Sequence, residues 1–566
     1  MATATRYPVA DIRAHALAAT APPPPKQVAD IITLTEKESQ VCSLLDEFTK
    51  ELRKTGDEYA GVECRIAGGW LLGIPSNDID IALANIMGVP FAEKLQAYMI
   101  SQNIIPKPDP KGNSRSGTVA TIGKNPEQSK HLETARMTVL GHEVDFVNLR
   151  SETYAEDSRI PTMEIGTPLE DALRRDITIN ALFYNIHTRS VEDLTEKGLD
   201  DLRNGIVRTP LAPLETFTDD PLRVLRCVRF SSRFGFTIVE EAQKAMKEKL
   251  IQDRLVTKIS RERVGEELIK MLKGTSPLLS LSTIYDLGLY TPIFGIPPAL
   301  KSKMFGVMGA DAMALDTAIV LCDFLAPGPS LLPAPHPLLL EYAQGDLGAR
   351  QRLILGAAVS HWSRAMYTEK KKVASLSEGI IREGLKIGGH FLTAVPNLFD
   401  AHKLVSKPSL EKFEGPSERS LIGVLLRDKK VHNPQHGTHW STSLLFSLVL
   451  DLVPAIQRGV LDADRAEETI RMYNLFVDRI LELKLVESIE EPPRLNGKEI
   501  CALLGVKPGK EIGVYMEQVV RWQLDHPAAE LEACKSWLKE AHESGLLTSS
   551  VNAEGEAAHR DKRARV

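Results

Sequence analysis

The chain is 566 residues long, several times the length of a typical domain, so we expect about two to four domains with substantial cores. Its 75 acidic residues outnumber its 69 basic residues and give a formal net charge of -6, which excludes a general cationic surface for nucleic acid and leaves only a local one. Since no apolar run approaches the roughly 18 residues of a membrane span, no membrane association is expected.

The first 29 residues are expected to lie outside the folded part. Positions 21–26 contain four consecutive prolines, which favour an extended linker, and order is expected to begin near Asp30. The first 20 residues carry Arg6, Arg13 and one acid, Asp11, which resembles the composition of a mitochondrial transit peptide. A disordered tail is the favoured interpretation.

The next segment predicts a small head of mixed helices and strands. Thr35 and Glu38 form a capping box ahead of apolar residues that recur at helical spacing up to Gly56. Short alternating runs then predict strands, the last two of them a hairpin: 65–67, 78–83, 137–140 and 143–147.

After about Asp171 the pattern is overwhelmingly helical, so the expected fold class is α+β, with a small mixed head followed by a long all-α neck, body and tail. The stretch 325–338 is rich in proline and glycine and predicts a loop or domain joint. A further helical block is expected over 443–541. Beyond Leu547 the composition is polar and predicts disorder.

Two carboxylates on the second predicted strand are the first candidate site. Because side chains alternate along a strand, Asp78 and Asp80 share one face while the isoleucines between and after them face the core. Such a pair repels itself unless a cation lies between, and phosphoryl transfer uses Mg²⁺ in that position. The preceding Gly68 and Gly69 suit a turn whose N–H groups approach phosphate oxygens. An exposed strand face without function is the alternative.

The predicted hairpin carries two further acids, Glu143 and Asp145. Either could bring a third carboxylate to the same place. The histidines, in contrast, show no metal-binding spacing, and we expect those near His436 to lie on a loop surface.

These residues belong to an ordered series of motifs that resembles a known family. Gly68-Gly69 followed by Asp78-Ile-Asp80 resembles the signature of the polymerase β nucleotidyltransferase superfamily. Later segments resemble the second to fifth motifs of class II CCA-adding enzymes and bacterial poly(A) polymerases: 174–184, 199–208, 217–230 and 258–264. Segments 130–135 and 144–150 resemble the eukaryotic branch. The middle of the chain, 300–440, resembles nothing recognisable.

The resemblance implies template-independent addition or repair of the 3'-terminal CCA of tRNA from CTP and ATP, with Mg²⁺ as cofactor and release of pyrophosphate. It implies Asp78 and Asp80 as metal ligands, with Asp145 as a further catalytic acid. Two alternatives stay open: a poly(A)-type RNA nucleotidyltransferase on the same fold, and a non-catalytic tRNA-binding variant. The oligomeric state is left open.

Base selection is expected at Asp220 and Arg223, which stand three apart on a predicted helix and therefore share a face. A carboxylate accepts a hydrogen bond from the exocyclic amine of cytosine or adenine, while a guanidinium donates to the adjacent ring nitrogen. Uracil and guanine have a carbonyl in place of that amine, so both are rejected. The resemblance implies this role for the pair, with Asp219 in support.

The ribose and phosphates are expected at Asp176 and Asn180, which stand four apart on a predicted helical face, and at Arg175. The resemblance implies hydrogen bonds from the first two to the 2'-hydroxyl and from the arginine to the phosphates. The full implied nucleotide-binding set is Gly68, Gly69, Arg174, Arg175, Asp176, Asn180, Asp219, Asp220, Arg223 and Arg226. The stretch 221–270 holds 12 Lys or Arg against 7 Asp or Glu and is expected to meet tRNA phosphate.

The chain departs from the family pattern at the glycine turn. Family members read Gly-Gly-x-Val-Arg-Asp-x-Leu-Leu-Gly, whereas Trp70 here runs straight into Leu71. About four residues are missing, among them an arginine expected to touch the triphosphate, which shortens a helix by about 6 Å but keeps its face in register. Either the chain is an impaired variant, or the sequence reflects an incomplete gene model or splice form, which we favour.

We therefore expect six regions: a disordered or targeting tail (1–29), a nucleotidyltransferase catalytic head (30–190), a helical neck with the nucleotide-selecting motif (191–290), a helical body (291–442), a helical tRNA-binding tail (443–546) and a disordered basic C-terminus (547–566). The six scattered cysteines indicate reducing compartments. The cytoplasm and nucleus are expected, with the mitochondrion as a further alternative.

Overall fold

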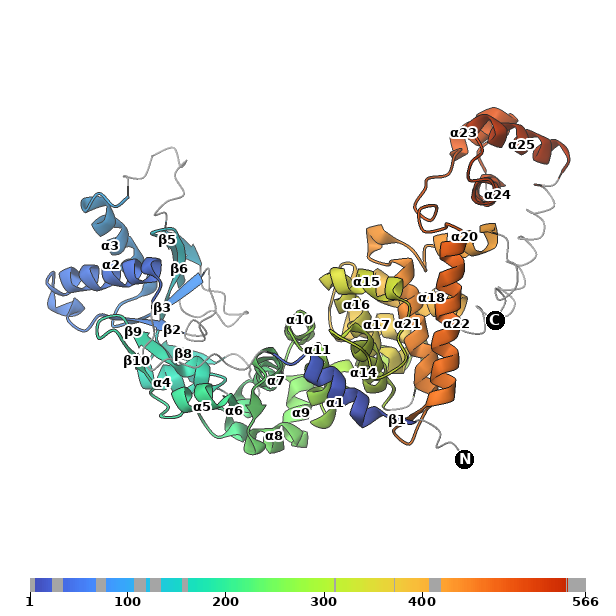
Figure 1. Cartoon of the computed structure of the whole chain (residues 1–566). Helices are drawn as coiled ribbons and strands as arrows, with labels where there is room; N and C mark the ends of the chain where they lie inside the picture. Colours follow the sequence, from blue (N-terminus) through green and yellow to red (C-terminus); the bar gives the residue numbers. More distant parts are fainter. Residues whose placement is uncertain are drawn as a thin grey trace. The chain divides into compact units, whose positions relative to one another are not determined.

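The computed structural model describes residues 6–22, 34–67, 78–105, 119–122, 134–154, 161–309, 312–370, 372–406, 419–509, 511–545 and 547. The chain divides into two compact units, which are described one at a time (Figure 1). The head-and-neck unit comprises Thr20–Ile296 and Glu383–Lys386. The body-and-tail unit comprises Met1–Ala19, Pro297–Arg382 and Ile387–Val566.

A seven-stranded sheet forms the centre of the head, with strand order β10-β9-β2-β3-β6-β5-β4. Strands β3 and β6 pair in parallel, whereas β5 and β6 form the antiparallel hairpin that the sequence predicts. The strand bounds are β2 (Glu63–Ala67), β3 (Asp78–Ala84), β4 (Ala120–Ile122), β5 (Thr134–Val139), β6 (His142–Asn148), β9 (Phe183–Asn185) and β10 (Ser190–Glu192).

Two helices, α2 (Glu36–Arg53) and α3 (Gly88–Ser101), contribute the aromatic core against one face of this sheet (Figure 1). The ring of Phe91 lies 5.1 Å from that of Phe146 on β6 and 5.2 Å from that of Phe48, centroid to centroid. The predicted capping box at Thr35 begins α2. Because this face is filled by apolar side chains, the polar residues that alternate with them lie on the opposite face.

The neck continues from the head as short strands and helices around α7 (Leu222–Phe234), which packs against α6, α10 and α11. The remaining elements of this unit are η1 (Asp57–Tyr59), β7 (Arg150–Thr153), β8 (Thr162–Ile165), α4 (Pro168–Leu173), η4 (Thr178–Ala181), α5 (Gly198–Asn204), β11 (Ile206–Val207), α6 (Pro213–Asp219), β12 (Thr237–Ile238), α8 (Glu240–Lys247), α9 (Lys249–Thr257), α10 (Arg261–Leu272), α11 (Pro277–Asp286) and α12 (Tyr290–Phe294). Arg261 donates to the main-chain carbonyl of Pro292, 3.0 Å away, so this residue of the fifth motif has a structural role.

The body-and-tail unit is mainly helical, as predicted. Helices α14 (Met313–Leu325), α16 (Leu347–Ala358), α18 (Phe391–Val405) and α21 (Trp440–Leu452) form its centre. Around them lie α13 (Pro298–Lys301), β13 (Met304–Gly306), α15 (Pro337–Gly345), η5 (Ser360–Trp362), β14 (Ala365–Glu369), β15 (Lys372–Ser375), α17 (Leu376–Gly379), η6 (Ile380–Gly384), α20 (Arg419–Arg427), η8 (Pro434–His436), η9 (Val453–Ala455), β16 (Ile456–Gln457), β17 (Val460–Asp462), α22 (Ala463–Glu482), α23 (Gly497–Leu504), α24 (Glu511–Asp525) and α25 (Leu531–Glu543). None of the helices in the described ranges is long and apolar enough to cross a membrane.

The N-terminal segment corrects one prediction. Strand β1 (Arg6–Pro8) pairs with β17, and helix α1 (Val9–Ala19) packs on α14. Ile12 is 1% exposed, and His15 Nδ1 lies 2.7 Å from an oxygen of the fully buried Asp323. The expectation of a disordered tail before Asp30 is therefore wrong for residues 6–19. An alanine-rich composition concealed the helical spacing of the buried positions 9, 12 and 16.

This docking makes the segment part of the core, which a substitution can test. We expect Ile12→Ala to lower the free energy of unfolding of the body-and-tail unit by about 2–5 kcal/mol, because it leaves a cavity against α14. The exposed Asp11→Ala on the same helix is the control and is expected to change it by less than about 0.5 kcal/mol. Urea unfolding measures both. Equal effects of the two variants would show that the segment is undocked in solution.

Candidate functional site

The face of the head sheet opposite α2 and α3 carries a row of acidic side chains. Asp80 on β3 and Asp145 on β6 are register partners in the parallel pair, so their side chains lie side by side on strands about 4.8 Å apart. Asp80 is exposed, and the Asp145 side chain is 16% exposed. One row further along, Asp78 is the partner of Glu143. The pairing thus brings Asp80, one of the two predicted metal ligands, next to Asp145, the predicted further catalytic acid.

Several predicted residues cannot be placed in this row. Gly68 and Gly69 lie outside the described residues, as does the whole shortened turn at 68–77. For Asp78 the backbone is described but not the side chain. The acidic row is therefore defined by Asp80 and Asp145.

Arg136 on β5 extends the row by one strand. It is the antiparallel partner of Asp145, and its fork binds both carboxylate oxygens: Nε to Oδ1 and Nη2 to Oδ2, each 2.6 Å. This residue was not among the candidates predicted from the sequence. The signal was present, because the tight turn at Leu140 and Gly141 fixes the hairpin register and so sets Arg136 opposite Asp145.

A buried aspartate, Asp171, holds the two arginines of the second motif. Arg174 donates from Nε at 2.9 Å, and Arg175 donates from Nε and Nη2 at 3.0 and 2.7 Å. Burial alone would raise the pKa of Asp171, but the two guanidinium charges outweigh it and hold the pKa below its usual value. Asp171 was missed in the sequence, although its spacing of three and four residues from the arginines is a signal.

A second buried acid, Glu152 on β7, joins these arginines to α7. Its Oε1 accepts from Arg174 Nη1 at 2.9 Å, and its Oε2 accepts from the hydroxyl of Tyr154 at 2.8 Å and lies 3.7 Å from Arg223 Nη2. Arg223 in turn donates to the main-chain carbonyl of Arg174 at 2.6 Å. Since β6 leads through Leu149 into β7, this network continues the strand that carries Asp145.

Asp176, Asn180 and Arg226 form a third buried contact. One oxygen of Asp176 accepts from the Asn180 amide at 2.9 Å and the other from Arg226 Nε at 2.7 Å. Burial opposes the charge of Asp176, but Arg226 and the two side-chain hydrogen bonds lower its pKa. The predicted shared helical face is wrong: Asn180 lies in the short 3-10 helix η4 and Asp176 precedes it, because the β-branched run 177–179 disfavours an α-helix.

Asp220 and Arg223 lie close together, but not on one helix as predicted. Asp220 has extended backbone (φ -128°, ψ 96°) because it precedes Pro221, and α7 begins two residues later. Its Oδ1 accepts from the Leu222 N–H at 3.1 Å and its Oδ2 from Arg263 at 2.9 Å. The main-chain oxygen of Asp220 accepts from the N–H of Arg223 at 3.0 Å, which keeps the two adjacent.

Asp219, the last residue of α6, lies beside this pair. Its pKa is raised, mainly by burial and also by Glu215 and Glu152, although Arg223 and Lys258 oppose the shift. Asp219 thus differs from Asp171 and Asp176, whose pKa values are lowered by the arginines that they hold.

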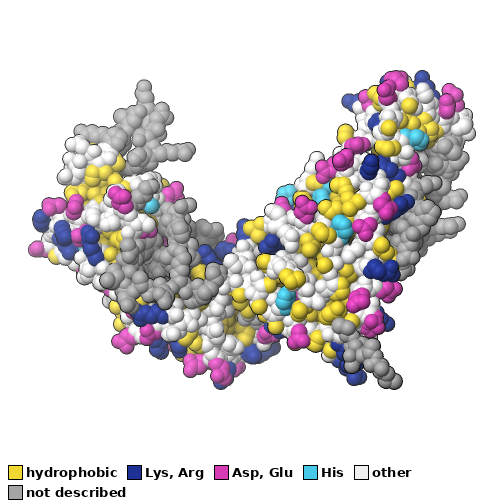
Figure 2. Space-filling model, viewed as in Figure 1, with side chains coloured by type: hydrophobic (Ala, Val, Ile, Leu, Met, Phe, Trp, Pro, Cys, Tyr) yellow, Lys and Arg dark blue, Asp and Glu magenta, His cyan; other side chains and the backbone are white. Residues whose placement is uncertain are grey.

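Most cations of the basic stretch 221–270 are used within the protein. Arg226, Arg229 and Arg263 pair with acids, and Arg254 and Lys258 donate to the carbonyl of Thr218. Among the described side chains on the face in Figure 2, Lys and Arg are interspersed with Asp and Glu. This stretch therefore supplies less free charge to RNA than its composition predicts.

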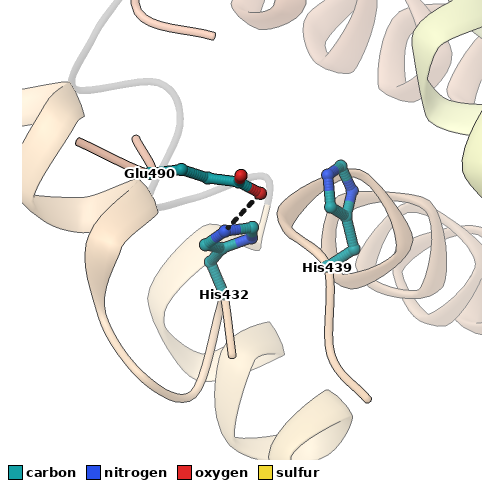
Figure 3. A group of neighbouring side chains, drawn as sticks. All are labelled: His432, His439 and Glu490. Carbon is teal, nitrogen blue, oxygen red and sulfur yellow. Dashed lines mark ion pairs between the residues drawn. The ribbon is translucent and has the colours of Figure 1, made fainter. Parts of the chain in front are cut away.

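A cluster of two histidines and a glutamate lies in the body-and-tail unit (Figure 3). His432 Nε2 is 3.4 Å from Glu490, and His439 stacks on Tyr342 with ring centroids 4.2 Å apart. The expectation of loop-surface histidines holds for His436 but is wrong for His432, which is 8% exposed, and His439 is partly buried at the start of α21.

Hydrogen bonds at the start of α21 determine whether the two histidines can bind a metal ion. His432 Nδ1 accepts from the Trp440 N–H at 3.2 Å, and His439 Nδ1 accepts from the Ser441 N–H at 3.3 Å. Neutral rings bonded in this way carry their proton on Nε2, so they lack the lone pair there that a metal ion needs. The cluster therefore caps α21 and ties it to Glu490 rather than forming a metal site.

The sequence matches known proteins over most of its length. Residues 64–208 match the family model "Poly A polymerase head domain", and residues 235–304 match "Probable RNA and SrmB- binding site of polymerase A". The chain is 38% identical to the "CCA tRNA nucleotidyltransferase, mitochondrial" of Saccharomyces cerevisiae, a match that covers 88% of this chain and 91% of the yeast protein.

Solved structures share the fold. One, titled "The complex structure of CCA-adding enzyme with CTP", has a TM-score of 0.57 at 18% identity and covers 95% of this chain and 99% of its own. Another, titled "Thermotoga maritima CCA-adding enzyme complexed with tRNA_CCA", has a TM-score of 0.54 at 16% identity and covers 95% and 100%. At these identities the likeness concerns the fold.

The histidine cluster predicts a pH dependence of stability. Burial and the neighbouring His432 lower the pKa of His439 to about 4, against 6.5 in an unfolded chain. As the pH falls from 6.5 towards 4, the unfolded chain binds a proton that the folded chain does not, so the free energy of unfolding falls by about 3 kcal/mol in total. His439→Asn keeps a capping oxygen but cannot titrate, so we expect its loss of stability between pH 6.5 and 4.5 to be smaller by about 2 kcal/mol. Urea unfolding of the wild type and variant at both pH values measures this. Parallel curves would contradict it.

Proposed function

The chain belongs to the family of CCA tRNA nucleotidyltransferases, and from this membership we propose that it adds or repairs the 3'-terminal CCA of tRNA without a template, using CTP and ATP and releasing pyrophosphate. The observation that carries the proposal is the parallel pairing of β3 with β6, which sets Asp80 beside Asp145 on the face of the head sheet opposite α2 and α3. Paired carboxylates on that face are what phosphoryl transfer to a hydroxyl requires.

Asp78 and Asp80 are the proposed ligands of a divalent cation, Mg²⁺, with Asp145 near the attacking 3'-hydroxyl. The donor set fits, because Mg²⁺ prefers carboxylate oxygens. Asp78 and Asp80 alternate onto one face of β3, and the register partner of Asp80, Asp145, adds a carboxylate from β6 beside them. A bound Mg²⁺ would lower the pKa of the hydroxyl and stabilise the leaving pyrophosphate. The protein's own part is to hold these carboxylates on two hydrogen-bonded strands, so that little reorganisation is needed.

Asp220 and Arg223 are the proposed readers of the base. Contacts to Leu222 and Arg263 fix the Asp220 carboxylate, and a main-chain hydrogen bond keeps Arg223 close in the chain, while its guanidinium is held by the carbonyl of Arg174. A fixed carboxylate accepts from the exocyclic amine of cytosine or adenine and cannot accept from the carbonyl of uracil or guanine. Asp219, with its raised pKa, supports this pair.

The buried arginine network is the proposed cradle for the ribose and triphosphate. Arg175 donates to Asp171 and to the carbonyl of Asn180, and a guanidinium has five N–H donors, so it keeps donors for phosphate. Arg174 and Arg226 are held in the same way by Glu152, Asp171 and Asp176, and Gly68 and Gly69 complete the proposed set.

The helical tail, 443–546, is the proposed site for tRNA. We also propose the cytoplasm and nucleus as compartments, with the mitochondrion suggested by the name of the yeast relative. Because residues 6–19 are built into the body, their use as a targeting signal would require their release before import.

Removal of one acid of the row tests the proposed metal site. We expect Asp80→Asn to lower the rate of CMP and AMP incorporation into tRNA lacking its CCA end by at least about 100-fold, because a charge at the reacting phosphate is lost. Binding of tRNA should stay within about twofold, since the side chain is exposed and the substitution keeps its size. Asp200→Asn, a surface acid 75% exposed, is the matched control.

The length of the product separates the alternatives. With labelled CTP and ATP, the wild type should extend tRNA that lacks its CCA end by three nucleotides ending in A. An open-ended A tract would favour the poly(A)-type alternative. No incorporation by the wild type, together with retained tRNA binding, would favour the non-catalytic variant and point to the shortened turn after Trp70.

Base selection has its own test. We expect Asp220→Ala to reduce incorporation from CTP and ATP by about 10- to 100-fold, the value of a hydrogen bond to a charged group, and to narrow the preference over UTP and GTP. Single-turnover rates with each of the four nucleotides measure this. An equal loss for all four would contradict base reading and leave Asp220 as a cap for α7.

A further inference from the structure

The row of register partners across the head sheet places a cation next to the proposed metal site. Asp80 pairs with Asp145, and Asp145 pairs with Arg136, so the three side chains follow one another across β3, β6 and β5 on the same face. The partner of Asp80 on the other side is Ala67 on β2, which contributes no charge. The order along the row is thus acid, acid, cation.

Arg136 occupies both oxygens of Asp145. Its Nε and Nη2 each lie 2.6 Å from one oxygen, whereas its contact with Glu143 is 3.9 Å long. Its own side chain is 43% exposed, and that of Asp145 is 16% exposed. A bidentate pair with one exposed partner is directional but weak, so it can open at small cost.

The same two oxygens are those that a cation between Asp80 and Asp145 would use. A carboxylate that binds a guanidinium through both oxygens has less charge to offer, and a guanidinium beside the row repels a second cation. Without a cation of any kind, however, two adjacent carboxylates would repel each other. The two carboxylates therefore need a counter-ion that a divalent cation can displace.

We propose that Arg136 is this resident counter-ion: it neutralises and orients Asp145 in the metal-free head and releases it to a divalent cation, so that it sets the concentration of cation at which the row fills. This role rests on the proposed metal site and makes Arg136 a positioning residue. Substitution of Arg136 should therefore increase the affinity for a divalent cation. A variant that merely damaged the fold would decrease this affinity.

The test measures binding of Mn²⁺ to the full chain, without nucleotide or tRNA, from the electron paramagnetic resonance signal of the free ion. Arg136→Met removes the charge and the fork but keeps an unbranched side chain. We expect it to lower the Kd for Mn²⁺ by about 3- to 10-fold. The guanidinium no longer competes with Mn²⁺ for the Asp145 carboxylate, and its positive charge no longer repels the ion. Arg136→Lys, which keeps the charge, should lie between this variant and the wild type.

Two further variants make the result specific. Arg203→Met removes a surface arginine of α5 that pairs with Asp200 and should leave the Kd unchanged. In an Asp145→Asn background, Arg136→Met should no longer tighten binding, because the carboxylate over which the two cations compete is gone.

Each outcome decides the question. Tighter binding by Arg136→Met that vanishes in the Asp145→Asn background supports the proposal. An unchanged or weaker affinity, with Mn²⁺ binding still dependent on Asp80, overturns the counter-ion role alone. No binding by the wild type or by Arg136→Met overturns this role together with the metal site.

Discussion

The parallel pairing of β3 with β6 is the constraint on which the site depends. Local sequence makes β3 a strand with its acids on one face, but only the pairing with β6 sets Asp145 next to Asp80. The opposite face of both strands is filled by buried side chains such as Ile79 and Phe146, so a slip of one residue would turn the acids into the core. The apolar core beneath the sheet thus fixes the register, and the register fixes the distance between the carboxylates.

A second principle organises the neighbouring neck: buried acids hold arginines in place before any ligand binds. Asp171 and Glu152 have side chains 2% and 5% exposed and pair with four arginines between them, and Asp176 holds a fifth. Removing one such acid would leave buried guanidinium groups without a partner, which costs more than the pair contributes. Because the acids are on β7, on α4 and just before η4, the network also joins the head to α7. We infer that it is a rigid, preorganised surface for a polyanion.

The elements of the head that depend on short stretches of sequence could be predicted. The capping box at Thr35, the alternation at 78–83 and the hairpin after Val139 all follow from short-range chemistry, and each is confirmed. The errors come from local signals that were overlooked, such as Pro221, which forces Asp220 out of the helix, and the helical spacing of residues 9–16. Other features lie beyond local sequence, because the partner strands of β3 and the docking of α1 are set by packing between distant segments. The resemblance to a family filled part of this gap, but it did not indicate Arg136.

The position of a divalent cation in the head can be measured directly. Crystals of the full chain grown with Mn²⁺ and CTP would locate the ion by its anomalous scattering. We expect a peak between the carboxylates of Asp80 and Asp145, with the guanidinium of Arg136 no longer bound to both oxygens of Asp145. A well-ordered β3 and β6 with bound CTP and no peak at these two carboxylates would contradict it.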